Sequence, residues 1–464
     1  MNPENFVING SESVHAALRA IESNKQGMVF ISCDGNSIKG IATDGDIRRF
    51  LISSGTLDDP ISKCINKKFI WEKIGTPREL LLKKLDHKTR VIPLLDEDKR
   101  LISIISRDFA PVVDEESIYA RARSPVRISF AGGGSDLTHF FSGETSGAVI
   151  NATIASFSHA LLRIRSDQKI IIKSMDLNAT LEANTLEEAL STKGEFGLLQ
   201  ALIKIINPNF GFELYLNSDF PIRSGLGGSA VVASAVLGCF NEFRRDQWDR
   251  YEIAELAYQA ERHHLNISGG WQDQYASVFG GLNFMEFRMS QNIVHPLRVP
   301  DSTLLELEES LVLCNTGLSH QSDEIHKDQR REVQRKDVRC VLEENVKLSY
   351  QIRDELLRGR LREFGSLLDK AWQQKRQFSR KITCTAIDKI YEDAMANGAL
   401  GGKLLGAGGG GFFLFYVPPY KKHQLLDFFK SQNFLYQSVR FEDKGLQSWK
   451  VRESKSHTPN ELQK

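Results

Sequence analysis

The feature that most constrains this chain is a glycine loop that opens an apolar run. Residues 225–230 read Gly-Leu-Gly-Gly-Ser-Ala, and residues 231–237 continue with the small and aliphatic side chains of a buried helix. Glycine lets the backbone approach a ligand closely, and a helix that begins there offers unpaired N–H groups and a positive dipole end. The loop therefore predicts a phosphate site, with a tight packing turn as the alternative for such a loop alone. It is not a Walker loop, because no Gly-Lys-Ser/Thr closes it.

Two further glycine blocks accompany this loop. Residues 124–136 read Ser-Pro-Val-Arg-Ile-Ser-Phe-Ala-Gly-Gly-Gly-Ser-Asp, a strand-like run that ends in glycines and a polar pair. Residues 403–417 place several glycines before a strongly apolar strand. A flexible turn and a hinge are the alternatives for each block taken alone. Three such blocks in one chain are hard to explain as three unrelated turns.

In this order the blocks resemble the three signature motifs of the GHMP kinases, the superfamily of galactokinase, homoserine kinase and mevalonate kinase. The resemblance spans roughly residues 120–450. Its details are similar to those of D-glycero-D-manno-heptose 7-phosphate kinases, and the similar segments are 131–137, 147–154, 272–275, 280–282 and 316–317. The chain departs from the family pattern at three positions. Gly228 stands where serine is usual, Trp271 where lysine is common, and Asn266 where glycine is common.

The resemblance implies an α+β kinase of two domains. Residues 120–310 are expected to form the N-terminal, ATP-binding domain, with a fold like domain 2 of ribosomal protein S5, and residues 311–452 a ferredoxin-like C-terminal domain. Apolar periodicity predicts helices over 186–206, 229–245, 249–265 and 323–358. The polar tail 453–464 is expected to be disordered.

The first 115 residues form a separate α/β module in this interpretation. Helix and strand patterns recur in it as a weak internal repeat, and residues 40–46 read Gly-Ile-Ala-Thr-Asp-Gly-Asp. The module resembles a tandem CBS pair, which implies that Thr43 and Asp46 hold a regulatory nucleotide. The second copy is degenerate near Asp108. A docking or dimerisation module that binds nothing is the alternative, and it leaves a homodimer open. The acidic residues 114–120 are predicted to join it to the kinase.

Composition excludes several classes of function. The chain of 464 residues carries 60 Lys and Arg against 59 Asp and Glu, so its net charge of +1 offers no basic face for nucleic acid. We find no uninterrupted apolar span and no basic-then-apolar signal segment, so we expect a cytoplasmic protein without a membrane partner. The six scattered cysteines lack a Cys-x-x-Cys pair and are expected to be reduced thiols.

Phosphoryl transfer requires a phosphate cradle and a metal ion, and the resemblance assigns residues to both. ATP phosphates are expected to contact the loop residues Gly225, Leu226, Gly227, Gly228, Ser229 and Ala230. The Ser229 hydroxyl and the Glu261 carboxylate are expected to hold Mg²⁺, a hard ion that needs few protein oxygens. For Glu261 the alternative is a surface carboxylate paired with Arg262 or His264.

Asp273 matches the catalytic aspartate of the family, since it lies in a Gly-x-x-Asp-Gln setting at residues 270–274. Its carboxylate is expected to take the proton from the attacking sugar hydroxyl. The alternative is a cap for the next helix. Arg127 is the first-motif cation that is expected to keep Asp273 ionised, with a strand-surface salt bridge as the alternative.

The acceptor sugar is expected to bind beside the first block. The resemblance assigns it to Gly133, Gly134, Ser135, Asp136, Gly270 and Gln272. The Asp136 carboxylate can accept hydrogen bonds from two neighbouring hydroxyl groups, and a cap for a helix over 137–141 is the alternative or additional role. The glycines of the third block are expected to approach the phosphate loop and shape the floor of the site.

The sequence therefore predicts an ATP-dependent kinase that phosphorylates the anomeric hydroxyl of a sugar or sugar phosphate. The favoured acceptor is D-glycero-D-manno-heptose 7-phosphate, which gives a 1,7-bisphosphate for nucleotide-sugar and cell-surface glycan synthesis. A fucose- or hexose-type 1-kinase is the alternative. A hypothesis of another class is a catalytically inactive ligand-sensing protein. The presence of Arg127, Ser229, Glu261 and Asp273 argues against it.

Overall fold

The computed structural model describes residues 3–32, 37–76, 78–86, 89–106, 118–142, 145–221, 224–265, 268–318, 322–332 and 335–452. The contacts within it divide the chain into two units, Met1–Glu115 and Glu116–Lys464. Several sequence predictions fall outside the described residues, namely those for Asp108, for Asn266, for most of the join and for the tail 453–464.

The first unit contains two small sheets of the same topology. One consists of β1 (Val7–Asn9), β2 (Met28–Ser32) and β3 (Ile38–Thr43), and the other of β4 (Glu72–Lys73), β5 (Val91–Leu95) and β6 (Leu101–Ser106). In each sheet the first two strands are parallel and the last two antiparallel. The accompanying helices are α1 (Val14–Asn24), α2 (Asp44–Ile52) and α3 (Arg78–Lys84). This duplicated order confirms the internal repeat that the sequence predicts.

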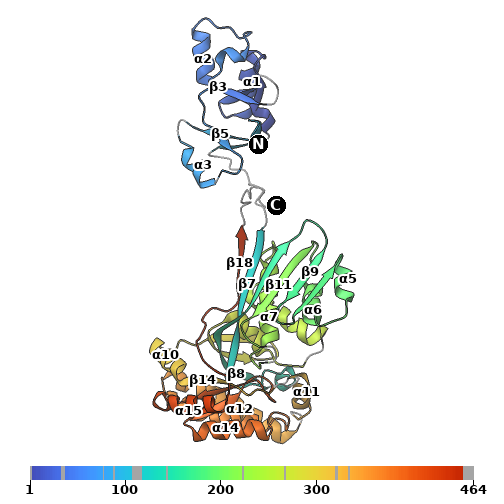
Figure 1. Ribbon diagram of the computed structural model, residues 1–464, viewed down its shortest axis with the longest axis vertical. Coiled ribbons are helices and arrows are strands. Elements are labelled where there is room, and N and C mark those ends of the chain that lie inside the picture. The colour runs from blue at the N-terminus through green and yellow to red at the C-terminus, as the bar shows by residue number, and fades with distance from the viewer. Residues whose placement is uncertain are drawn as a thin grey trace, which may run out of the picture. The chain divides into compact units, whose positions relative to one another are not determined.

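The second unit is built on an eight-stranded sheet. Two long strands, β7 (Ile118–Ala131) and β8 (Gly147–Ile164), form its spine (Figure 1). Its other members are β9 (Ile170–Ser174), β10 (Ala179–Ala183), β11 (Phe212–Ser218), β12 (Leu282–Phe287), β13 (Asn292–Pro296) and β18 (Gln447–Arg452). Strand β18 pairs with β7, so the end of the described chain returns to this sheet.

The helix after the glycine loop, α7 (Gly228–Asn241), packs against β7 and β8. Small residues let its whole circumference be buried, because a wide side chain on the inner face would hold the helix away from the sheet. The predicted helix over 249–265 is α8 (Arg250–Gln259) followed by a π-helical turn, Ala260–His264. Such turns shift the direction of the side chains that follow them, and this one carries Glu261.

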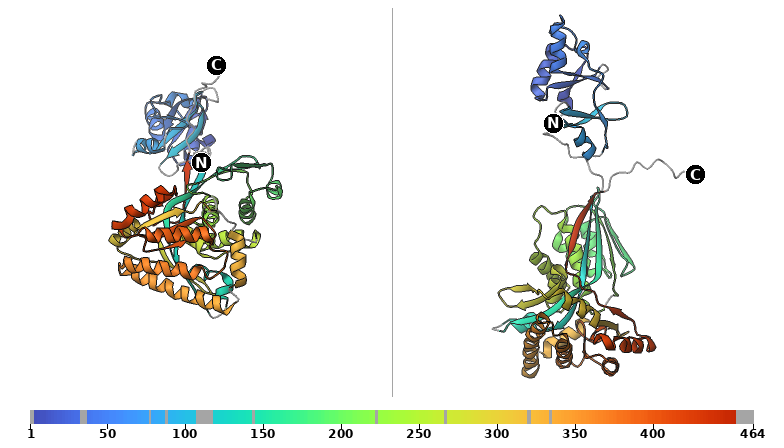
Figure 2. Two further views of the ribbon diagram at one scale, coloured as in Figure 1. Left: turned by 60° about the horizontal axis from the view of Figure 1, so that its bottom comes forward. Right: turned by 90° about the vertical axis from the view of Figure 1, so that its left-hand side faces the viewer.

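A second, four-stranded sheet has the order β15-β16-β14-β17. These strands are β14 (Leu311–Asn315), β15 (Gly401–Leu404), β16 (Phe412–Tyr416) and β17 (Tyr436–Ser438). The later helices, orange to red in Figure 2, gather around it: α12 (Lys336–Leu357), α13 (Leu361–Lys375), α14 (Thr385–Ala396) and α15 (Pro419–Ser431). Helix α10 (Asp301–Ser310) leads into β14.

Two of the predicted helices are interrupted. The segment 186–206 forms α5 (Leu186–Ser191) and α6 (Gly197–Ile206), with Gly194 at positive φ between them. The segment 323–358 forms α11 (Ser322–Glu332) and α12, which begins after Arg335 in extended conformation. In the first segment the polar run Ser-Thr-Lys-Gly-Glu at residues 191–195 marks the break, whereas the second segment contains no glycine or proline that would mark one.

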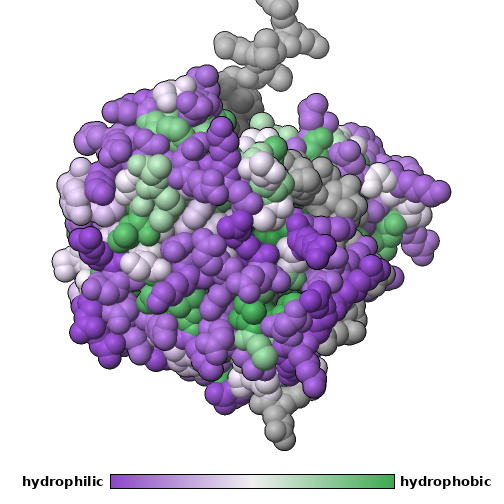
Figure 3. Space-filling model, turned by 90° about the horizontal axis from the view of Figure 1, so that it is seen from below, coloured by the Kyte–Doolittle hydropathy of each residue, from purple (hydrophilic) through white to green (hydrophobic). Residues whose placement is uncertain are grey.

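The surface of the second unit seen in Figure 3 is dominated by hydrophilic side chains, with hydrophobic residues in small separate areas. Among the described helices, none combines the length and apolar composition that crossing a membrane requires. The described cysteines are free thiols, of which Cys64, Cys239 and Cys314 are buried.

Candidate active site

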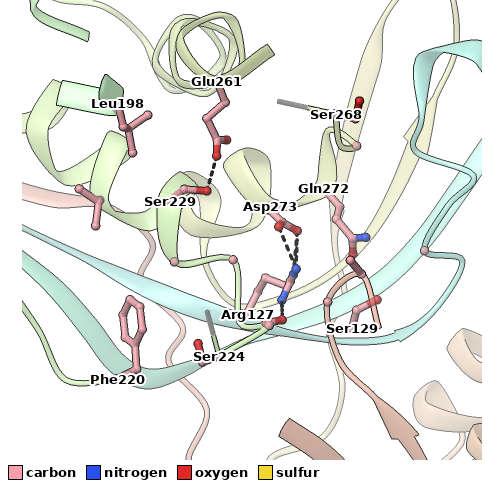
Figure 4. Close-up of a pocket in the computed structure, with 18 of the residues that line it drawn as sticks. Arg127, Ser129, Leu198, Phe220, Ser224, Ser229, Glu261, Ser268, Gln272 and Asp273 are labelled. Carbon is pink, nitrogen blue, oxygen red and sulfur yellow. Dashed lines mark hydrogen bonds and ion pairs between the residues drawn. The ribbon is translucent and has the colours of Figure 1, made fainter. Parts of the chain in front are cut away.

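A cavity of about 390 Å³ lies where the three glycine blocks meet. The wall of this cavity includes Arg127 and Gly133 from the first block, Gly225 and Ser229 from the second, and Gly406 from the third. Figure 4 shows the Arg127–Asp273 pair near its centre, with Leu198 and Phe220 to one side and Ser129 and Gln272 to the other. The structure thus brings together blocks that are separated by almost three hundred residues.

The second block has the geometry of a phosphate cradle. Gly225 and Gly227 adopt φ values of 78° and 82°, which glycine tolerates, and Gly227 caps α7 without a side-chain hydrogen bond. The first N–H groups of α7 are therefore available to a ligand. Gly228 and Ser229 also line the cavity, whereas Leu226 and Ala230 are buried beneath the loop.

Phe220 accounts for the departure at Gly228. A Cβ atom on residue 228 would lie 2.9 Å from the Phe220 ring. The ring thus occupies space next to the position where the family usually has serine. The glycine is a packing requirement of this chain rather than a loss of the cradle.

Arg127 and Asp273 form a two-pronged ion pair. The Arg127 Nε–H donates to Asp273 Oδ1 and an Nη2–H donates to Asp273 Oδ2, both at 2.8 Å. The Arg127 Nη1 also donates to the carbonyl oxygen of Gly225, at 2.8 Å. Arg127 is buried, so the strand-surface salt bridge is wrong. Asp273 lies in the first turn of α9 (Gln272–Phe279), which has no side-chain cap, so the capping role is also wrong.

Ser229 and Glu261 lie in direct contact. The Ser229 hydroxyl donates a hydrogen bond to Glu261, and the Gln274 side-chain amide donates to its other carboxylate oxygen. Glu261 is buried, so it is not a surface carboxylate, although it does pair with Arg262, at 3.9 Å, as the alternative expects. Two oxygen ligands beside a phosphate cradle suit a hard divalent ion that completes its shell with phosphate and water. Among the described residues, no three His, Cys, Asp or Glu side chains cluster as a protein-only metal site.

Asp136 is buried on the other side of the Arg127–Asp273 ion pair. Its Oδ1 accepts the Gly134 N–H at 2.9 Å and its Oδ2 accepts the Gln272 N–H at 3.1 Å. Burial raises the pKa of Asp136, and the charge of Asp273 adds to the rise, while these two N–H donors oppose it. The predicted helix cap is wrong, because α4 (Thr138–Phe141) follows Leu137 without a side-chain cap.

The predicted sugar residues separate into two groups. Gly133, Gly134, Asp136, Gly270 and Gln272 all line the cavity. The side chain of Ser135 does not. Its hydroxyl donates to the carbonyl oxygens of Gly132 and Ala148 and accepts the N–H of Ala148, so it holds the turn between β7 and β8. We therefore assign this structural role to Ser135 in place of the predicted contact with the sugar.

Several lining residues were missed by the sequence analysis. Its apolar lining includes Leu198, Leu199, Leu216, Phe220 and Val232. Gln329, Lys375, Phe378 and Lys403 also line it. Lys403 lies within the third glycine block, so its position in the sequence indicates that it is near the site. The others belong to helices and strands whose apolar patterns indicate only a core.

In the first unit, Thr43 and Asp46 form a reciprocal capping box at the start of α2. Asp46 accepts the Thr43 N–H at 3.0 Å and the Thr43 hydroxyl at 2.6 Å, and it pairs with Arg49 at 2.5 Å. A cavity of about 500 Å³ lies next to them, and its wall includes Thr43, Lys68 and Arg90. Asp46 does not line this cavity.

Comparison with known proteins agrees with the geometry. The pattern of the GHMP kinases N terminal domain matches residues 192–281, and that of the GHMP kinases C terminal domain matches residues 352–433. A D-glycero-alpha-D-manno-heptose 7-phosphate kinase from Campylobacter jejuni is 34% identical over 337 residues, which cover 71% of this chain and 99% of that protein. An L-fucokinase/L-fucose-1-P guanylyltransferase from Bacteroides fragilis is 29% identical over 68% of this chain and 36% of its own length.

Solved structures give the same picture. A D-glycero-D-manno-heptose 1-phosphate kinase from Bacteroides thetaiotaomicron superposes with a TM-score of 0.60 at 27% identity, over 72% of this chain and all of that chain. A galactokinase from Lactococcus lactis superposes with a TM-score of 0.59 at 18% identity, over 71% of this chain and 95% of that chain, and supports the fold alone. The chain therefore belongs to the GHMP kinase family and is an ATP-dependent sugar kinase.

Proposed function

We propose that this kinase transfers a phosphoryl group from ATP to the anomeric hydroxyl of D-glycero-D-manno-heptose 7-phosphate, which gives the 1,7-bisphosphate and ADP. The Arg127–Asp273 pair is the observation that carries the proposal, because it sets a carboxylate beside the phosphate cradle within one cavity. The heptose phosphate kinase among the relatives supports the choice of acceptor. A fucose- or hexose-type 1-kinase is the alternative, supported by the fucokinase relative.

The proposed reaction begins with ATP bound along the cavity. The purine base lies at the apolar end, against Leu198 and Phe220, and the phosphates accept N–H groups from the second block. The sugar lies at the other end, where Asp136 and Gln272 fix its hydroxyl groups. This order places the anomeric oxygen next to Asp273.

Asp273 then acts as the general base. The proton of the anomeric hydroxyl passes to an Asp273 oxygen as the oxygen–phosphorus bond forms, and the bond to the bridging oxygen of ADP breaks. Arg127 donates two hydrogen bonds to this carboxylate, which fix its orientation. Ser229 and Glu261 would hold Mg²⁺, which neutralises phosphate charge when bound.

A direct assay tests this function. Purified protein is mixed with ATP, Mg²⁺ and, in parallel, heptose 7-phosphate, free heptose, fucose and galactose, and the product is identified by ³¹P NMR. We expect the highest kcat/KM with heptose 7-phosphate and a new anomeric phosphate signal. A kcat/KM that is at least tenfold higher with a free hexose would instead support the fucose- or hexose-type 1-kinase.

The first unit has a second proposed role, as a CBS-like pair that binds a regulatory nucleotide. Its cavity combines Thr43 with two cationic side chains, Lys68 and Arg90, and the aromatic Phe69, which suits a phosphate group attached to a flat base. Thr43 lines this cavity, although the side chains of both Thr43 and Asp46 take part in the capping box. A docking or dimerisation role is the alternative.

Free thiols and the use of ATP support the cytoplasm as the compartment of this protein.

A further inference from the structure

Two buried lysines line the kinase cavity. Lys375 ends α13, and its Nζ donates to the carbonyl oxygens of Leu404 at 2.7 Å and Gly406 at 2.6 Å. Lys403 lies in β15, and its Nζ donates to the Ser129 carbonyl oxygen at 3.1 Å. The two lysine residues are 7% and 4% exposed. Within the described parts of the chain, neither ammonium group forms an ion pair with a carboxylate.

Burial of an ammonium group without a counter-charge is costly. Burial, together with the charges of Lys403 and Arg127, holds the pKa of Lys375 well below its usual range. Burial and Arg127 lower the pKa of Lys403 to about 7, against the opposing effect of Asp136. Each ammonium group has three N–H donors, and its short contacts to backbone carbonyls leave at least one for a ligand. An anion in the cavity would remove the cost.

The charges already present do not supply that anion. Asp273 is fully engaged by Arg127, and Asp136 accepts two backbone N–H groups. The phosphates of ATP have their own cradle at the second block, with Ser229 beside it. An additional negative group in the cavity would supply the missing counter-charge.

The position of Lys403 indicates where this group lies. Its Nζ is 3.5 Å from the Ser129 hydroxyl, and Ser129 stands with Gln272 on the opposite side of Asp273 from Phe220 (Figure 4). A Cβ atom on Gly133 would lie 3.4 Å from the Gln272 amide nitrogen and 3.9 Å from the Ser129 hydroxyl oxygen. Lys403 is thus a neighbour of the acceptor sugar rather than of the purine base.

We infer that Lys375 and Lys403 form an anion subsite that binds the phosphate which the acceptor sugar already carries. This inference rests on the proposed function, since it assumes that the acceptor is a sugar phosphate. A free sugar of the same shape would leave both ammonium groups buried without a counter-charge. The subsite therefore selects phosphorylated over unphosphorylated acceptors.

Neutral variants test the subsite. In Lys375→Gln and Lys403→Gln the amide keeps an N–H donor for the carbonyl oxygens but loses the charge. We measure kcat and KM for heptose 7-phosphate and for free heptose with ATP saturating. Each variant is expected to lower kcat/KM for the 7-phosphate by about 10- to 100-fold, mainly through KM, and to change the value for free heptose by less than about threefold. An equal loss of kcat with both acceptors would overturn the inference and assign the lysines to the transferring group or to folding.

The controls separate this inference from the proposed function. Lys370→Gln removes an exposed lysine from the same helix and is expected to leave both acceptors unaffected. A thermal shift with inorganic phosphate, at saturating non-hydrolysable ATP analogue, requires no turnover. Wild-type protein is expected to be stabilised and the two variants not, and equal stabilisation of all three would overturn the subsite. If wild-type protein shows the shift but does not phosphorylate heptose 7-phosphate, the proposed function fails and the subsite stands.

Discussion

A Cβ atom on Gly406 would lie 2.7 Å from the Cα atom of Gly225, so the third glycine block and the phosphate loop meet backbone to backbone. Gly406 has a φ of 66°, and the Lys375 ammonium donates to its carbonyl oxygen at 2.6 Å. The contact confirms the expected approach of the two blocks. It also links the ATP end of the cavity to the buried lysines.

Gly406→Ala is expected to displace the phosphate loop. The added methyl group meets backbone atoms, which cannot rotate away, and an alanine at this φ costs about 1–2 kcal/mol by itself. We expect KM for ATP to rise by about tenfold or more. Gly359→Ala is the matched control, since its φ is 69° but its Cβ atom would meet only the Thr303 hydroxyl, at 3.1 Å. Equal KM values in the two variants would show that the contact does not shape the cradle.

Asp273→Asn is expected to remove the general base while leaving ATP binding intact. Loss of such a group typically lowers kcat by about 100- to 10,000-fold. Turnover is followed by ADP release and nucleotide affinity by calorimetry. Asp167→Asn, at an exposed ion pair with Arg165, provides the control. Wild-type turnover in Asp273→Asn would exclude this carboxylate from proton transfer.

Gly270→Ala is expected to weaken sugar binding more than ATP binding. A Cβ atom on residue 270 would lie 1.8 Å from Asp136 Oδ2, so this carboxylate must leave its position. We expect KM for the acceptor to rise at least about tenfold, as Asp136 loses its alignment. In the neighbouring Gly269→Ala the methyl group meets the guanidinium end of the Arg262 side chain instead of Asp136, and a smaller change is expected. The idea fails if both variants keep the wild-type KM.

The stability of the ligand-free kinase is expected to depend on the ionisation of Lys403. Its pKa is about 7 in the folded protein and 10.5 in an ordinary lysine. Between these values the unfolded chain binds a proton that the folded chain lacks, so this residue makes unfolding less favourable as pH rises from 7 to 10. The melting temperature of wild-type protein should therefore rise over this range relative to that of Lys403→Gln. If the melting temperatures of the two proteins change in parallel with pH, Lys403 keeps its proton over this range.

Removal of the first unit is expected to leave an active kinase. A chain that begins at Glu116 retains every residue of the kinase cavity, and contacts divide the molecule at this point. If the first unit binds a nucleotide, initial rates of the full chain should respond to a panel of adenine nucleotides and those of the shortened chain should not. Identical responses would favour the docking or dimerisation role. An insoluble shortened chain would show that the kinase fold depends on the first unit.

The sequence by itself determined the glycine blocks and the side chains next to them. Their spacing reflects local backbone requirements: Gly225 and Gly227 need positive φ, and Asp273 follows a tight approach at Gly270. These requirements concern consecutive residues, so they can be recognised in the sequence without knowledge of the fold. The same holds for the internal repeat of the first unit, because each copy is a short local pattern.

Only the tertiary structure decided which distant side chains complete the site. Lys375 ends a helix whose periodicity indicates only a core, yet burial beside Leu404 and Gly406 makes it a wall of the cavity. The family resemblance already assigns Glu261 and Ser229 to one metal ion, but it is the π-helical turn that buries the Glu261 carboxylate against the Ser229 hydroxyl. Contacts between residues far apart in the chain depend on how elements pack, and hydrophobic patterns specify burial without specifying the partner.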